Sequence, residues 1–154
     1  MAPLIALVVV TSLLLVVGKL GVARLSWPVA LRGGLAVMFT LTGGAHFVGL
    51  REELIAMVPP VLPAPGLLVT VTGVLELLGA AALLWSRTAG WSALGLTAML
   101  VAMFPANVQK ALSGPVSWDD QLVPRTLMQV VFLAATVAVA RYYLKRRSTV
   151  QSRP

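Results

Sequence analysis

The sequence predicts an all-α integral membrane protein, a four-helix bundle preceded by one additional transmembrane helix. Composition is the first reason, because 58% of the 154 residues are hydrophobic and 11% are charged, whereas about a quarter of a soluble domain is charged. The second reason is that the charges leave long uncharged runs between them, such as Leu54–Leu75 and Thr88–Gln109. A helix needs about 20 mostly apolar residues to cross a bilayer, and these runs supply them.

The uncharged runs predict five membrane-spanning helices in chain order. Residues 1–27 form the predicted N-terminal anchor helix and turn, 28–144 the four-helix membrane core, and 145–154 a basic cytoplasmic tail. The third helix counts as one span although Glu76 interrupts its apolar run. The predicted spans are roughly Leu4–Val22, Pro28–Leu50, Gly66–Trp85, Ala89–Val108 and Leu122–Tyr143.

The first span has a second interpretation, as a cleavable signal peptide. Gly21-Val22-Ala23 would be a small-residue cleavage site. However, a signal peptide carries its positive charge before the apolar run, and the first charge here, Lys19, follows that run. We therefore expect an uncleaved anchor.

The basic residues predict the orientation of the bundle. Cytoplasmic loops carry an excess of Lys and Arg. In this sequence, alternate connections differ sharply in their number of Lys and Arg residues. One side would hold Arg51, Lys110 and Arg125, and the other would hold the remaining nine of the 12 cations. We expect a multi-pass membrane protein with its N-terminus outside and its C-terminus in the cytoplasm. The net charge of +7 is thus topogenic, and we expect no nucleic-acid partner. The nine cations are Lys19, Arg24, Arg32, Arg87, Arg141, Lys145, Arg146, Arg147 and Arg153.

The outer connection between the second and third spans is rich in proline. Its first half, Arg51–Met57, is predicted to form a short amphipathic turn at the membrane interface. Its second half is predicted to be extended, because each proline fixes φ and restricts the residue before it. The candidate residues of this outer loop are Arg51, Met57, Pro59, Pro60 and Pro63.

Polar side chains inside the predicted spans are the candidate functional residues, because such groups are costly in hydrocarbon. Glu76 lies ten residues into its span, near the bilayer midplane at 1.5 Å per residue. The others lie toward the outer ends of their helices, so we expect a polar pocket that opens outward. The ligand-binding candidates are His46, Glu76, Asn107, Arg125, Gln129, Thr72 and Thr42.

Each candidate also has a structural interpretation. Glu76 would pair with His46 or Arg125 as a link between helices, Asn107 would cap its helix, and Arg125 would extend to the interface as a helix-end residue. The methionines would be ordinary lipid-facing or core residues. With one His and no Cys, we expect no metal site, and no catalytic motif is present.

Four segments resemble the DoxX-like family of small bacterial membrane proteins. Together they cover roughly residues 30–140, and the first span would be an addition before the family's four-helix core. The segments are Phe39–Phe47 followed by Arg51, Met57–Pro60 with Leu62-Pro63, Thr72–Ala80, and Phe104–Val108.

The resemblance implies redox-linked roles, because some members are associated with thiosulfate:quinone oxidoreduction or with an oxidative-stress complex. It implies at most an accessory subunit of a quinone-linked oxidoreductase, with a quinone headgroup in the outer pocket and His46 and Glu76 handling its protons. No other cofactor is expected. The alternatives are a small transporter component and a purely structural assembly partner. In any of these roles, the expected partners are the lipid bilayer and either another membrane protein or a second copy of the chain in a homo-oligomer.

Overall fold

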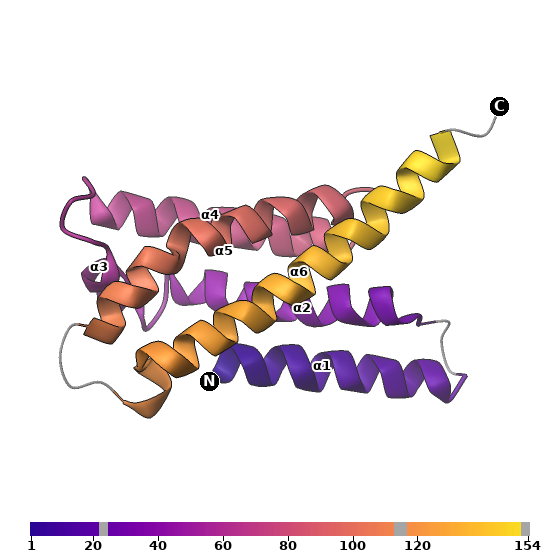
Figure 1. Cartoon of the computed structure of the whole chain (residues 1–154), viewed down its shortest axis with the longest axis horizontal. Coiled ribbons are helices and arrows are strands. Elements are labelled where there is room, and N and C mark those ends of the chain that lie inside the picture. Colours follow the sequence, from indigo (N-terminus) through magenta and orange to yellow (C-terminus); the bar gives the residue numbers. More distant parts are fainter. Residues whose placement is uncertain (22–24, 113–116, 152–154) are drawn as a thin grey trace.

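The chain forms a helical bundle, which confirms the predicted fold class (Figure 1). The computed structural model describes residues 1–21, 25–112 and 117–151, and these contain helices and no strand. Val22 and Ala23 of the proposed cleavage site lie outside the described residues. The helices are α1 (Ala2–Lys19), α2 (Trp27–Ala45), α3 (Arg51–Met57), α4 (Pro65–Leu83), α5 (Ala89–Leu112), the 3₁₀ turn η1 (Trp118–Asp120) and α6 (Leu122–Gln151).

Four of the helices, α1, α4, α5 and α6, are long and apolar enough to cross a membrane. This is compatible with a multi-pass membrane protein. The second predicted span corresponds to α2, which runs along the bundle but does not reach the same hydropathy. It carries Arg32 and two glycine pairs, and more of its residues are buried than in any other described helix. A helix enclosed by other helices needs less apolar surface than one that faces lipid.

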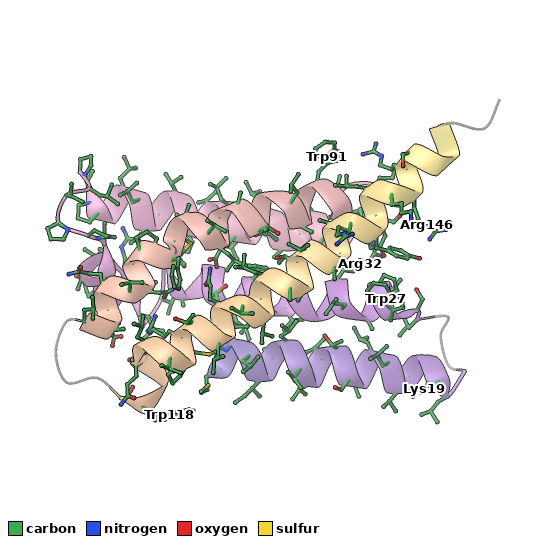
Figure 2. The ribbon with its side chains drawn as sticks, in the orientation of Figure 1. Lys19, Trp27, Arg32, Trp91, Trp118 and Arg146 are labelled. Carbon is green, nitrogen blue, oxygen red and sulfur yellow. The ribbon has the colours of Figure 1, made fainter. Side chains whose placement is uncertain are left out.

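The long helices alternate in direction, so the bundle has two distinct ends (Figure 1). One end holds the first turn of α1, α3 and η1, and is called the α3 end below. The other holds Lys19, the start of α2 at Trp27 and the C-terminal part of α6, and is called the basic end (Figure 2). Exposed tryptophans lie at both ends, Trp118 at the first and Trp27 and Trp91 at the second. Trp favours the two membrane–water interfaces, so this placement fits a bundle that crosses the bilayer lengthwise.

Helix α1 packs mainly on α2, and the rest of its surface is open. In α1, which is described throughout, Leu7 alone is buried. The contact is close because Gly34 of α2 has no side chain: a Cβ there would lie 2.1 Å from Thr11 Oγ1 and 2.9 Å from the Leu7 carbonyl oxygen. The exposed apolar side chains of α1 suit a helix that faces lipid along most of its length.

Glycines also set the spacing between α2 and α4. A Cβ on Gly73 would lie 2.5 Å from the Cβ of His46, and a Cβ on Gly43 would lie 3.0 Å from the Cβ of Glu76. Small residues allow helix backbones to approach closely in membranes. These two glycines thereby bring the His46 and Glu76 side chains to the same interhelical seam.

Helix α6 is longer than the predicted span and continues beyond the core. It extends from Leu122 to Gln151, so much of the predicted tail, 145–154, is a helical extension past the other helices at the basic end. Its buried face, which includes Thr136, Val139 and Tyr143, packs into the core with Leu35 and Phe39 of α2.

Candidate functional site

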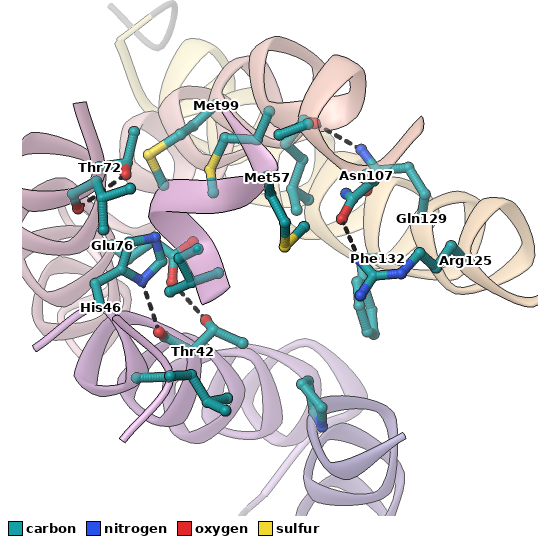
Figure 3. Close-up of a pocket in the computed structure, with 18 of the residues that line it drawn as sticks. Thr42, His46, Met57, Thr72, Glu76, Met99, Asn107, Arg125, Gln129 and Phe132 are labelled. Atoms are coloured by element: carbon teal, nitrogen blue, oxygen red, sulfur yellow. Dashed lines mark hydrogen bonds between the residues drawn. The ribbon is translucent and has the colours of Figure 1, made fainter. Parts of the chain in front are cut away.

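A cavity of about 670 Å³ lies toward the α3 end of the bundle (Figure 3). Its walls come from α2, α4, α5 and α6, α3 and the following loop contribute further residues, and Met1–Pro3 at the start of α1 also line it. All of the ligand-binding candidates predicted from the sequence line this one cavity: Thr42, His46, Thr72, Glu76, Asn107, Arg125 and Gln129.

Their polar groups form two clusters on opposite walls of the cavity (Figure 3). The first cluster is centred on Glu76, which is 3% exposed. The Thr42 hydroxyl on α2 lies 2.5 Å from Glu76 Oε2 on α4 and 3.4 Å from the Phe39 carbonyl oxygen. A hydroxyl both donates and accepts, so Thr42 can donate to a carboxylate, or accept from a carboxylic acid while donating to Phe39. The link therefore serves Glu76 with or without its proton.

His46, the residue that follows α2, lies one turn beyond Thr42 and is also buried. Its Nδ1 is 2.8 Å from the Thr42 carbonyl oxygen. A carbonyl can only accept, so Nδ1 carries a proton and donates. Nε2 is then the ring nitrogen that can accept from or donate to a molecule in the cavity, according to the charge of the ring.

The structure does not give Glu76 either of the partners expected from the sequence. Within the described residues its hydrogen bond is to Thr42, and no bond or ion pair joins it to His46 or Arg125. The reason is geometric: the close approach at Gly43 places Thr42 against Glu76, whereas Arg125 is held on the opposite wall by other groups. Thr72 hydrogen-bonds carbonyls of its own helix, at Leu68 and Val69.

The second cluster is centred on Arg125 in the first turn of α6. Its Nη1 donates to Asn107 Oδ1 at 2.6 Å, and its Nη2 is paired with the Asp120 carboxylate of η1. One turn further along α6, Gln129 Nε2 donates to the Leu100 carbonyl oxygen at 2.6 Å. This bond joins α6 to α5.

The structure contradicts the simpler interpretation of Asn107. Asn107 does not cap α5, because the helix continues to Leu112 and the Asn107 side chain is engaged by Arg125. The Arg125 side chain, which is 17% exposed, is held by Asn107 and Asp120. Asp120 is a cavity residue that the sequence did not single out. It lies in a connection, where no periodicity indicates which way a side chain points.

The outer loop covers the cavity, but its predicted residues differ in role. Met57 and Pro59 line the cavity, whereas Pro60 and Pro63 are exposed and are not part of the lining. Arg51 does not line it either and instead links three elements, donating to the His46 and Gly66 carbonyl oxygens and to Thr70 Oγ1 at 3.0 to 3.3 Å. Arg51 thus fixes the position of α3 against α2 and α4.

The methionines are the largest difference from the sequence-based interpretation. All six methionines of the chain line the cavity, although the sequence singled out Met57 alone, as an outer-loop residue, and indicated ordinary lipid or core positions for the others. Methionine is unbranched and polarisable and adapts its shape to a partner. The wall between the two polar clusters is therefore apolar and adaptable. The six are Met1, Met38, Met57, Met99, Met103 and Met128.

The fold and the cavity define a class of protein, a helical bundle that is compatible with a multi-pass membrane protein and that holds a partly polar cavity. A family model described as "Domain of unknown function (DUF8561)" matches residues 35–140, more than half of the chain. The chain belongs to this family. No curated protein and no solved structure matches it. The matched region contains α4 and α5 whole with the cavity-lining parts of α2 and α6, and it excludes α1.

Proposed function

We propose that the protein binds a small lipophilic, quinone-like molecule in the cavity at the α3 end. The observation that supports this most directly is the pair of hydrogen-bonding clusters, around Glu76 and around Arg125, on opposite walls of one methionine-lined space. Small-molecule sites are mostly apolar cavities of roughly 300–1,000 Å³ with a few placed polar groups. A volume of about 670 Å³ falls within that range.

A quinone headgroup suits the chemistry of the two walls. It carries oxygens on opposite edges of an apolar ring, and each wall offers polar hydrogens, from His46 on one side and from Asn107, Arg125 and Gln129 on the other. When bound, a quinone supplies two-electron, two-proton redox chemistry. His46 and Glu76 are the groups that would exchange protons at their wall, because both titrate and both line the cavity. In this role the chain is an accessory subunit of a DoxX-like oxidoreductase.

The methionines and α1 suit a ligand that carries a hydrocarbon tail. Met99 and Met103 on α5 lie on the apolar wall, where flexible thioethers can adapt to a chain. Met1–Pro3 line the cavity at the start of α1, where Ala2 is exposed, so the cavity extends toward the surface at this point. We propose that a lipophilic ligand enters there from the membrane.

The orientation proposed is N-terminus outside and C-terminus in the cytoplasm of a bacterial inner membrane. The described cations of the larger predicted set lie toward the basic end, as Lys19, Arg32 and Arg146 show (Figure 2). The chain has no cysteine, so single cysteines can be introduced and labelled with an impermeant maleimide. Ala56→Cys should label from outside and Ser148→Cys from inside, and the reverse pattern would overturn the orientation.

The binding proposal is tested on the whole protein, purified in mild detergent. Bound small molecules are extracted and identified by mass spectrometry, and a short-chain ubiquinone analogue is titrated by calorimetry. We expect saturable binding that weakens in Glu76→Gln and His46→Ala. Thr136→Val is the matched control, because Thr136 is fully buried but hydrogen-bonds only carbonyls of α6, at Phe132 and Leu133.

The main alternative is a structural assembly partner, and one observation favours it. Glu76 and Arg125 each already hydrogen-bond another element, which is how polar residues join helices in membranes. In that case Glu76→Gln and His46→Ala would lower the unfolding temperature, while no quinone or lipid would co-purify and the analogue would not bind saturably. A transporter component would instead show uptake or efflux in vesicles that is lost in Glu76→Gln.

A further inference from the structure

A second cluster of cationic and aromatic side chains lies at the basic end, away from the cavity. The guanidinium of Arg32 on α2 lies 5.3 Å from the centre of the Tyr143 ring, and that of Arg146 lies 5.7 Å from the centre of the Tyr142 ring. The two tyrosine rings meet edge to face at 5.1 Å, and Trp27 packs edge to face on Tyr142 at 5.3 Å. All five residues lie outside the region that the family model matches.

Arg32 is the unusual member of this cluster. It lies more than one turn into α2, and its Nη1 is buried without a hydrogen-bond partner in the described part of the chain. A ring face attracts a cation but accepts no strong hydrogen bond. A guanidinium presents five N–H donors in a planar fork that matches carboxylate and phosphate oxygens. Arg32 therefore lacks the acceptor that its position calls for.

The acidic side chains of the protein do not supply it. Its five acidic residues are Glu52, Glu53, Glu76, Asp119 and Asp120. Four of these belong to α3 or η1 at the far end of the bundle, and Glu76 faces the cavity. The basic end carries Lys19, Arg32 and Arg146 (Figure 2), and none of the five acidic side chains belongs to it, so an anion from outside the chain can serve as its counterion.

We propose that Arg32, Arg146 and the Trp27–Tyr142–Tyr143 rings bind the headgroup phosphate of an anionic phospholipid. The depth of Arg32, just inside the end of α2, matches the headgroup level of a bilayer that the bundle crosses lengthwise. Trp and Tyr are enriched at that level, and Trp27 is half exposed there. Basic pockets between helices on the cytoplasmic side bind anionic headgroups, whereas a free phosphate would make no use of the apolar helix faces next to the cluster.

Native mass spectrometry of the detergent-purified protein, titrated with phosphatidylglycerol, tests this site. We expect one lipid to be retained preferentially over phosphatidylcholine. Arg32→Gln and Arg146→Gln should each weaken its binding roughly tenfold, the effect of losing one charge-assisted hydrogen bond. Arg146 is exposed, so its replacement keeps the test valid if Arg32→Gln fails to fold. Arg87→Gln is the matched control, since it also removes an exposed cation, from the turn between α4 and α5.

Three results would overturn the proposal. If Arg87→Gln and Arg32→Gln weaken phosphatidylglycerol binding equally, the lipid is attracted by general surface charge. Equal retention of phosphatidylcholine and phosphatidylglycerol would mean that the phosphate charge is not recognised. Displacement of the lipid by millimolar inorganic phosphate would indicate a free-anion site. The quinone analogue should bind normally to Arg146→Gln, so this test stands apart from the one on the cavity.

Discussion

Thr42 and Glu76 join α2 to α4 through a hydrogen bond of 2.5 Å between the Thr42 hydroxyl and Glu76 Oε2. The bond lies deep in the bundle, where Glu76 is almost fully buried. A buried carboxyl without a partner is costly, so this link both stabilises the helix pair and holds Glu76 at the cavity wall.

Removing the Thr42 hydroxyl should therefore destabilise the protein. Interhelical hydrogen bonds in membranes average about 0.6 kcal/mol and reach about 1.7 kcal/mol, and we expect Thr42→Val to lie near the upper value. In a double-mutant cycle with Glu76→Leu, the double variant should be less destabilised than the sum of the single ones. Equilibrium unfolding in mixed detergent measures these energies, and strict additivity would show that the two residues do not interact.

Replacement of Gly73 should separate α2 from α4. A Cβ there would lie 2.5 Å from the Cβ of His46. Each Cβ is fixed by its own backbone and cannot rotate away, so the two helices would have to move apart. We expect Gly73→Ala to cost about 1–3 kcal/mol and to weaken ligand binding. Gly44→Ala is its control, because a Cβ at Gly44 meets nothing within 4 Å. Gly44→Ala should be neutral or stabilising by about 0.4–1 kcal/mol. Equal losses of stability in Gly44→Ala and Gly73→Ala would contradict the packing argument.

The residues of the cavity could be predicted from the sequence because depth along a helix follows from counting. The positions of His46, Asn107 and Arg125 near the outer ends of their helices, and of Glu76 below them, placed these groups at one end of the bundle. The partner of Glu76 could not be predicted in this way. Thr42 and His46 lie one turn apart on the same face of α2, and the contact between helices decides which of them reaches α4.

The methionine lining and the basic-end cluster escaped prediction for a different reason. A cavity wall and a lipid-facing surface are both apolar, so the sequence pattern around Met99 or Met103 is the same for either. The contacts of Arg32 and Tyr143 join residues more than 100 positions apart, and only the packing of α2 against α6 brings them together. Pairings between distant segments depend on helix rotation, which hydropathy does not fix.

Narrowing the cavity where α1 begins should slow the access of a ligand. Ala2 is exposed and yet lines the cavity, so Ala2→Trp would place a large ring at this point. We expect a lower association rate for the quinone analogue in stopped-flow measurements, with little change in thermal stability. Ile5→Trp is the matched control, since Ile5 is exposed on the same helix and is not part of the lining. Identical association rates in the two variants would place the opening elsewhere.

Asp120 should contribute more to stability than the more exposed acid Glu53. The Asp120–Arg125 pair is largely buried, with side chains 28% and 17% exposed, whereas Glu53 pairs with Lys110 at 3.7 Å and is 62% exposed. Removing one partner of a sheltered pair leaves a charge with poor hydration, whereas exposed pairs contribute about 0–1 kcal/mol. We expect Asp120→Asn to cost about 1–3 kcal/mol and Glu53→Gln less than 1 kcal/mol.

Added salt should reduce only the effect of Glu53→Gln, because screening acts on exposed charges. Unfolding of both variants at low and high salt measures this, and equal salt sensitivity would show that Arg125 is not sheltered at the cavity wall.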